Sequence, residues 1–229
     1  MAARNPFGRD LLKFLRDLER NNDRKWFDAN KRRYEESVRE PALEFIRAMA
    51  PGLRKISPYL VAGDKKVGGS LMRVYRDVRF SKDKRPFKTN LGIQFRHVDG
   101  KDVHAPGLYF HVQPGMVFLG AGMWHPEAQA LAAVREAIDR DPKTWKRIRD
   151  AKRFREAWEL RGDSLKRPPR GYPADHPMLD DLRRKDHIAI RDLTERDLKR
   201  TDLVSFLTRE YARTRNYTAW QAAALGIPF

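Results

Sequence analysis

Hydrophobic residues recur at helical spacing over residues 1–60 and predict a helical N-terminal part. The first helix is expected to end at Asn21-Asn22 and the second to begin near Asp23. Pro41 is expected to interrupt the second helix, and Pro51-Gly52 to end the turn that follows, because proline offers no backbone N–H to a helix interior. The residues expected to face inward are Phe7, Leu11, Phe14, Leu15, Leu18, Trp26, Phe27, Tyr34, Val38, Leu43, Phe45, Ile46 and Met49.

Over residues 67–122 the hydrophobic positions recur every second residue instead. Leu91, Ile93 and Phe95 alternate with polar residues and glycine, which is typical of a strand with one buried face. The polar positions between them would then lie together on the opposite face of the sheet.

Turn signals divide this region into short strands. Asp99-Gly100 is a hairpin signal that ends the first of them. Strand character resumes over residues 108–112, and Pro114-Gly115 separates that strand from another over residues 116–120. We therefore expect an antiparallel meander.

Residues 123–229 return to helical spacing and are expected to be helical apart from one long loop. That loop, residues 162–178, is rich in proline and glycine and should be exposed. Helices are expected again around residues 177–185 and 193–217. The order helix, sheet, helix predicts one α+β domain over residues 1–229, with N- and C-terminal helices packed on a central antiparallel sheet.

The composition is that of a globular protein, 41% hydrophobic over 229 residues. Cysteine is absent, which excludes disulfides, thiolate catalysis and cysteine-ligated metal centres. No apolar run approaches the roughly 20 residues that cross a bilayer. The N-terminal stretch MAARNPFGRD lacks the apolar core of a signal peptide. We expect a cytoplasmic protein without a membrane partner.

The net charge is strongly positive, +17, from 48 lysines and arginines against 31 aspartates and glutamates. The excess is spread through the chain rather than held in one tail. Such a balance favours an anionic partner, either nucleic acid or an acidic small molecule.

Residues 71–80 alternate like a strand and open a strongly basic stretch, "RVYRDVRFSKDKRPF". If they are extended, Arg76 stands alone among apolar residues on one face, and Arg73, Asp77 and Arg79 lie on the other. An arginine within an apolar face must be paired, because an isolated buried charge costs several kcal/mol. Its partner would be a carboxylate from the helices or an anionic ligand.

Residues 72–88 hold seven basic and two acidic side chains, a surplus of five positive charges. Arginine forks and lysine ammonium groups together could clamp a phosphate or a carboxylate. An internal network, in which the two aspartates tie down the arginines, is the alternative. The candidate ligand-binding residues are Arg73, Arg76, Asp77, Arg79, Asp83, Lys84 and Lys88.

This stretch resembles the hallmark motif of the uncharacterised domain-of-unknown-function family 2461. The resemblance extends to NNDRKWFDANKRRYE, VREPALEFI, VGGSL, KDVHAPGLYFHV and GAGMW, and so to most of the chain. It implies a mostly single-domain bacterial protein, with relatives in fungi, and no established activity. Phe87 stands where the family pattern usually has tyrosine, which puts in doubt any mechanism that needs a phenolic hydroxyl there. The matching residues are Arg73, Arg76, Asp77, Arg79, Phe80, Asp83 and Lys84.

Three histidines, His97, His104 and His111, are evenly spaced in the predicted meander. Strand positions at this spacing do not converge, so no metal site and no cofactor are expected. His97 would face Asp102 as an ordinary cross-strand pair. His111 shares its face with Tyr109, and polar residues of the preceding strand lie on that face too.

Three functions remain open on these residues. The leading hypothesis is a binding module whose cationic pocket holds an anionic ligand, either a phosphorylated molecule or nucleic acid. The rival is a metal-independent enzyme acting on an acidic substrate, with His111 or Asp77 as general acid–base. The third is an interaction protein in which the arginine–aspartate motif is only a structural ion-pair network.

Overall fold

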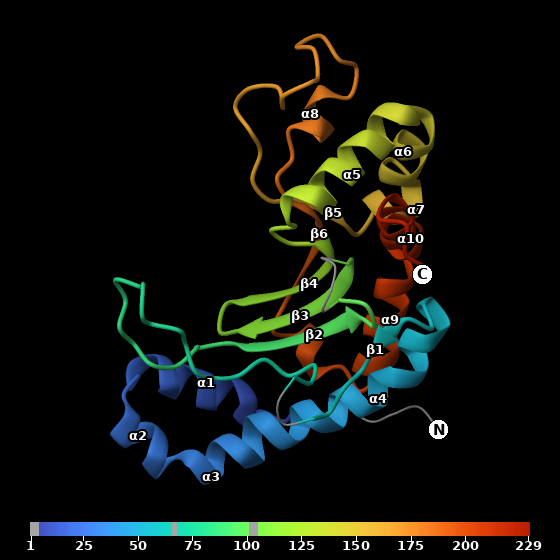
Figure 1. Cartoon of the computed structure of the whole chain (residues 1–229). Helices are drawn as coiled ribbons and strands as arrows, with labels where there is room; N and C mark the ends of the chain where they lie inside the picture. The colour runs from blue at the N-terminus through green and yellow to red at the C-terminus, as the bar shows by residue number, and fades with distance from the viewer. Residues whose placement is uncertain (1–4, 66–67, 101–104) are drawn as a thin grey trace.

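The N-terminal part of the chain is helical, as the hydrophobic spacing predicts (Figure 1). The computed structural model describes residues 5–65, 68–100 and 105–229. The Asp23 side chain starts the second helix by accepting a hydrogen bond from the Trp26 backbone N–H at 2.9 Å. The elements are α1 (Asp10–Arg20), α2 (Arg24–Ala29), α3 (Lys31–Tyr34), the π-helical turn η1 (Glu35–Arg39) and α4 (Glu40–Ile56).

Neither proline ends a helix where the sequence predicts it. Pro41 lies in the first turn of α4, where a missing N–H is tolerated, and the wider π-helical turn precedes it directly. Pro51 lies inside α4, which continues to Ile56. Gly52 brings α4 close to α9 (Leu203–Ala212), since a Cβ at this glycine would lie 2.6 Å from Thr208 Cγ2.

The strands of the described residues form one antiparallel sheet in the order β1-β2-β3-β4-β6-β5. The predicted strands β2, β3 and β4 are confirmed, and the Pro114-Gly115 turn joins β3 to β4. Lys101, Asp102 and His104 of the predicted hairpin lie outside the described residues. The bounds are β1 (Leu60–Val61), β2 (Leu91–His97), β3 (Gly107–Gln113), β4 (Met116–Met123), β5 (Glu159–Arg161) and β6 (His187–Leu193).

Strands β5 and β6 correct the prediction of an all-helical region over residues 123–229. Residues 187–190 of β6 are all buried, and because successive side chains point to opposite faces, both faces of the sheet are covered here. A short apolar run without alternation cannot be distinguished from a buried helix by its spacing. The helix predicted over residues 193–217 therefore begins only at Leu203.

The C-terminal helices gather around β5 and β6 and along the far side of the sheet (Figure 1). The loop over residues 162–178 is mostly exposed, as predicted. No helix within the described ranges is long and apolar enough to cross a membrane. The remaining elements are α5 (Ala128–Arg140), α6 (Pro142–Arg149), α7 (Lys152–Arg155), α8 (Leu179–Leu182), the 3₁₀ turn η2 (Asp197–Lys199) and α10 (Arg215–Ala224).

Helices from both ends of the chain pack on the sheet and confirm the α+β single domain. The ring of Phe110 in β3 lies 5.4 Å from that of Phe45 in α4, between ring centroids. On the C-terminal side, the Tyr211 hydroxyl of α9 donates to the Tyr109 carbonyl oxygen at 2.7 Å. The sheet residues that face this core are Leu91, Ile93, Phe95, Leu108, Phe110, Val112, Val117, Leu119, Ala121 and Met123.

Residues 71–80 do not form the predicted strand. They make only isolated bridges, Leu71 with Ile93 and Tyr75 with Phe87. The second bridge shows the reason: beyond Tyr75 the chain pairs with its own returning half rather than with β2. Leu71 and Val74 still pack partly against the core, but Val78 and Phe80 are not part of it, and Phe80 is 95% exposed.

Candidate functional site

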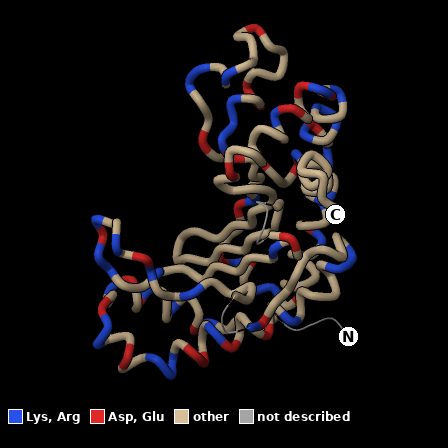
Figure 2. The backbone as a smooth tube through the Cα atoms, viewed as in Figure 1, with Lys and Arg blue, Asp and Glu red and all other residues tan. Residues whose placement is uncertain are grey.

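The basic stretch is a loop that leaves the edge of β2 and folds back on itself (Figure 2). The Arg76 N–H donates to the Pro86 carbonyl at 2.9 Å, and the Lys88 N–H donates to the Val74 carbonyl at 2.7 Å. We call residues 72–88 the basic loop. It projects on the side of α1 and α2.

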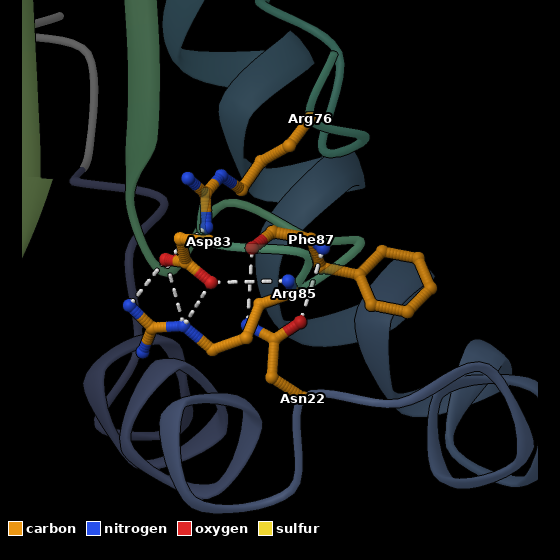
Figure 3. Close-up of polar contacts among 5 residues, drawn as sticks. All are labelled: Asn22, Arg76, Asp83, Arg85 and Phe87. Atoms are coloured by element: carbon orange, nitrogen blue, oxygen red, sulfur yellow. Dashed lines mark hydrogen bonds and ion pairs between the residues drawn. The ribbon is translucent and has the colours of Figure 1, made fainter. Parts of the chain in front are cut away.

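The returning half of the basic loop is anchored to the turn between α1 and α2 (Figure 3). The Asn22 side chain accepts from the Phe87 N–H and donates to the Phe87 carbonyl, each at 3.0 Å. The buried Phe87 ring stacks on Phe27, with 4.1 Å between ring centroids. Position 87 is thus a packing position in this chain.

Both aspartates of the basic loop are held by arginines of the same loop. Asp83 accepts from Arg85 at 2.7 Å and from Arg76 at 2.5 Å (Figure 3), and these bonds hold the pKa of its carboxyl well below the usual range. Asp77 accepts from Arg79 at 2.7 Å, which also lowers its pKa. These arginines make the internal network that the sequence left as an alternative. Arg76 is half-buried beside Asp83, not placed within an apolar face.

The remaining cations of the basic loop have no carboxylate partner. Lys84 Nζ donates to the Val78 carbonyl at 3.1 Å. Within the described ranges, the side chains of Arg73, Lys82 and Lys88 make no hydrogen bond or ion pair. The predicted ligand-binding residues therefore separate into an internally paired group and a few free cations.

A cleft of about 810 Å³ lies on the open face of β2, β3 and β4. Of the predicted site residues, it contains Lys88 and His111. Arg76 lines a smaller hollow of about 270 Å³, and Asp77 lines neither of the two. The residues that line it include Met72, Lys88, Asn90, Tyr109, His111, Phe118 and Trp124.

Four glycines, Gly100, Gly107, Gly120 and Gly122, line this cleft, and Gly92 lies against its Tyr109; none of them was predicted as part of a site. A Cβ at Gly92 would lie 2.7 Å from the Tyr109 hydroxyl, so the phenol can lie across β2 only because this residue is glycine. Gly122 has a φ of +114°, which other residues rarely adopt. Glycine in a strand interior often marks the close approach of another group. Recurrence of glycine on the polar face of the strands was the available sequence signal.

Tyr109 and His111 form a hydrogen-bonded pair on the open face. Tyr109 Oη lies 3.1 Å from His111 Nδ1, and His111 Nε2 lies 3.4 Å from Gln113 Oε1. Because an amide oxygen only accepts, Nε2 carries the proton, and Nδ1 accepts from the tyrosine. The His111 ring also stacks on Phe118, with 4.6 Å between ring centroids.

Burial sets the protonation of both members of this pair. It lowers the pKa of the His111 imidazole, which the bond to Gln113 partly offsets, and it raises the pKa of Tyr109 to about 12. At neutral pH the pair is therefore a neutral imidazole and an intact phenol. Such a pair can accept or relay a proton, whereas the tyrosine is not a nucleophile.

We predict that His111 titrates below 6.5, the reference value, and that Lys88→Met leaves this pKa unchanged. The cause of the lowered pKa is desolvation of the imidazole by burial, not the positive field of nearby cations. Titration of the His111 ring protons by NMR in both proteins measures it. A rise of the His111 pKa in Lys88→Met would show instead that positive charge depresses it.

Lys88 supplies positive charge at one end of the cleft. Burial lowers the pKa of its ammonium below the usual value, and repulsion from Arg73 lowers it further. Trp124, 59% exposed, lies at the opposite end, where β4 finishes. Arg96 and Glu127 also line the cleft, so Lys88 is not its only charged group.

His97 and His111 both line the cleft, but their rings lie on opposite faces of the sheet. The His97 ring is buried, stacks on Tyr59 with 5.5 Å between centroids, and lies 2.8 Å from the Pro228 carbonyl through Nε2. Among the residues that the structure describes, no group of three histidines or carboxylates could hold a metal ion.

Comparison with known proteins finds one family. No curated protein matches the chain, and no solved structure matches it. The model of a family described as "Conserved hypothetical protein (DUF2461)" matches residues 10–220. This range includes the sheet, the basic loop, the cleft and the helices up to the middle of α10, and the chain therefore belongs to the DUF2461 family.

Proposed function

We propose that the open-face cleft binds a small anionic molecule, with its phosphate or carboxylate on Lys88 and Arg73. The observation that carries this proposal is the environment of Lys88. Its ammonium group is half-buried at the wall of a large cleft, and it forms no ion pair with any carboxylate of the described residues. Burying part of a charge is unfavourable unless it is paired. Repulsion between the positive charges of Lys88 and Arg73 adds to that cost. A bound anion would offset both the desolvation of Lys88 and this repulsion.

The remainder of the cleft suits a ligand with a flat or apolar part. Its volume of about 810 Å³ lies within the range of about 300–1,000 Å³ typical of small-molecule sites. Met72, Phe118 and Trp124 supply apolar and aromatic surface, while Asn90 and Tyr109 supply polar groups. Apolar walls with a few directed polar groups are what such sites usually offer. A phosphorylated molecule with a ring fits this arrangement.

Lys88→Met tests the proposal, with pyrophosphate as the probe and isothermal titration calorimetry as the measurement. The variant is expected to bind about tenfold more weakly or worse, because a hydrogen bond to a charged group contributes about 1.5–3 kcal/mol. The melting temperature of the free protein should not fall, since the lysine is a half-buried cation that lies beside Arg73.

Lys84→Met is the matched control, because Lys84 lies in the same loop but outside the cleft. It should bind pyrophosphate like the unsubstituted protein. If Lys84→Met loses binding as strongly as Lys88→Met, the whole basic loop is the anion site and the cleft is not. If neither the unsubstituted protein nor Lys84→Met binds pyrophosphate at low salt, the proposal is wrong.

The Tyr109–His111 pair favours an acid–base enzyme as the second candidate function. Both groups line the cleft, and a neutral imidazole that accepts from a phenol can take up a proton during a reaction. Asp77 contributes nothing to this alternative, because it lies on the exposed loop, paired with Arg79. The titration of His111 tests it: a pKa well above 7 would leave little neutral imidazole to act as a base at neutral pH.

A further inference from the structure

The tip of the basic loop carries an apolar side chain that nothing in the described structure covers. Phe80 is 95% exposed, more than any other large hydrophobic residue among those described. The tip projects past the sheet, away from the α5 to α8 region (Figure 1). A fully exposed phenylalanine forgoes the roughly 1.5–3 kcal/mol that burial would contribute. It is therefore unexplained by the stability of the fold.

The surroundings of Phe80 are cationic. Residues 76–85 contain five basic and two acidic side chains, which leaves three net positive charges. The two aspartates are occupied by the loop's own arginines, so Lys82 stays unpaired within the described residues. Figure 2 shows these positive positions along the projecting segment. Such a surface favours an anionic partner.

One face of the Phe80 ring contacts the Arg79 guanidinium. The Arg79 guanidinium carbon lies 5.8 Å from the ring centroid, within the range of a cation–π contact. The exposed fraction of the side chain leaves the other face open to solvent. An aromatic face with flanking cations is the pattern that binds single strands of nucleic acid, by base stacking and phosphate contact.

We propose that the loop tip, residues 77–85, binds single-stranded nucleic acid, with one base stacked on Phe80 and phosphates on Lys82 and Lys84. An anionic lipid surface fits less well. Only Phe80 could enter the hydrocarbon there, and Arg79, held over its ring, would have to enter with it. This site is separate from the cleft, so it does not depend on the proposed small-molecule function.

Fluorescence anisotropy with labelled single strands of about 12 nucleotides tests the proposal, at low salt and over a salt series. Phe80→Ala is expected to weaken binding about 5- to 100-fold, because stacking contributes about 1–3 kcal/mol per base. Phe80→Trp should retain binding. Lys82→Ala should reduce the slope of log affinity against log salt by about 0.7.

Two further variants separate stacking at the tip from the other anion-binding modes. Phe80→Leu keeps an apolar side chain without a ring, so it should lose nucleic-acid binding as Phe80→Ala does. Lys88→Met alters only the cleft, so it should bind the strand like the unsubstituted protein. Absence of binding at low salt, full binding by Phe80→Leu, or equal losses in Lys88→Met and Phe80→Ala would each overturn the proposal. So would binding of Phe80→Leu to phosphatidylserine vesicles with no binding of nucleic acid by the unsubstituted protein.

Discussion

Replacing Glu210 with alanine is expected to destabilise the fold by about 3–5 kcal/mol, measured as the free energy of unfolding in urea. The Glu210 side chain in α9 is only 7% exposed and pairs with Arg191 of β6. Arg213 also contacts it, at 3.2 Å. Removing the carboxylate leaves two arginines without their shared partner at the junction of α9 and the sheet. The expected loss of unfolding free energy is several times larger than the loss caused by breaking an exposed ion pair.

The exposed pair of Arg32 and Glu36 provides the matched control. Both partners are surface residues of the N-terminal helices, and their side chains are 91% and 60% exposed. Glu36→Ala should leave the urea midpoint almost unchanged, because solvent screens exposed pairs. Arg76→Ala should fall between the two, since Asp83 keeps Arg85 as a second partner. Equal midpoints for Glu210→Ala and Glu36→Ala would contradict the account of this junction.

Acidification is expected to destabilise the protein strongly through His187. This histidine is fully buried on β6, and neither of its ring nitrogens has a hydrogen-bond partner. Burial lowers its pKa to about 3, and the positive charges of Arg184 and Arg135 add to the effect. In the unfolded chain the same imidazole titrates near 6.5.

The sign of the pH effect follows from these two pKa values. Between pH 6.5 and about 3, the unfolded chain binds a proton on His187 that the folded chain does not. Stability therefore falls as the pH falls through this window, by up to about 1.4 kcal/mol per pH unit. The contribution is fully present above pH 6.5.

Urea unfolding at a series of pH values measures this contribution, with His187→Leu as the comparison. The variant removes the titrating group and two unpaired polar atoms from a site beside Trp145, so its stability should depend less on pH below 6.5. An NMR titration of the unsubstituted protein checks the cause without any variant. A His187 ring that titrates near 6.5 in the folded protein would contradict the prediction.

The parts of the fold that follow from the sequence are those with one buried face. Leu91, Ile93 and Phe95 alternate because β2 packs one side on helices and leaves the other open, and this strand was predicted correctly. His187 to Ile190 are buried on both faces of the sheet and show no alternation, so their spacing could not indicate a strand. Their pairing with β4 is a long-range contact that no local pattern records.

The candidate site was predictable to a similar degree. Spacing by two placed His111 and Tyr109 on one polar face, which the structure confirms. The same rule failed for Phe80, because alternation predicts burial only where a second layer covers the strand, and the basic loop has none there. Charge alone could not show that Lys88 is a better candidate ligand-binding residue than Arg79. The two differ in the folded structure, where Arg79 pairs with Asp77 and Lys88 has no carboxylate partner.

A crystal structure of the protein grown with pyrophosphate would show directly whether the open-face cleft binds an anion at Lys88. The account predicts density for the anion in the open-face cleft, with a phosphate oxygen about 3 Å from Lys88 Nζ and the Arg73 guanidinium turned toward it. Pyrophosphate on Arg79 and Lys84 of the loop tip, with no anion in the cleft at saturating concentration, would contradict it.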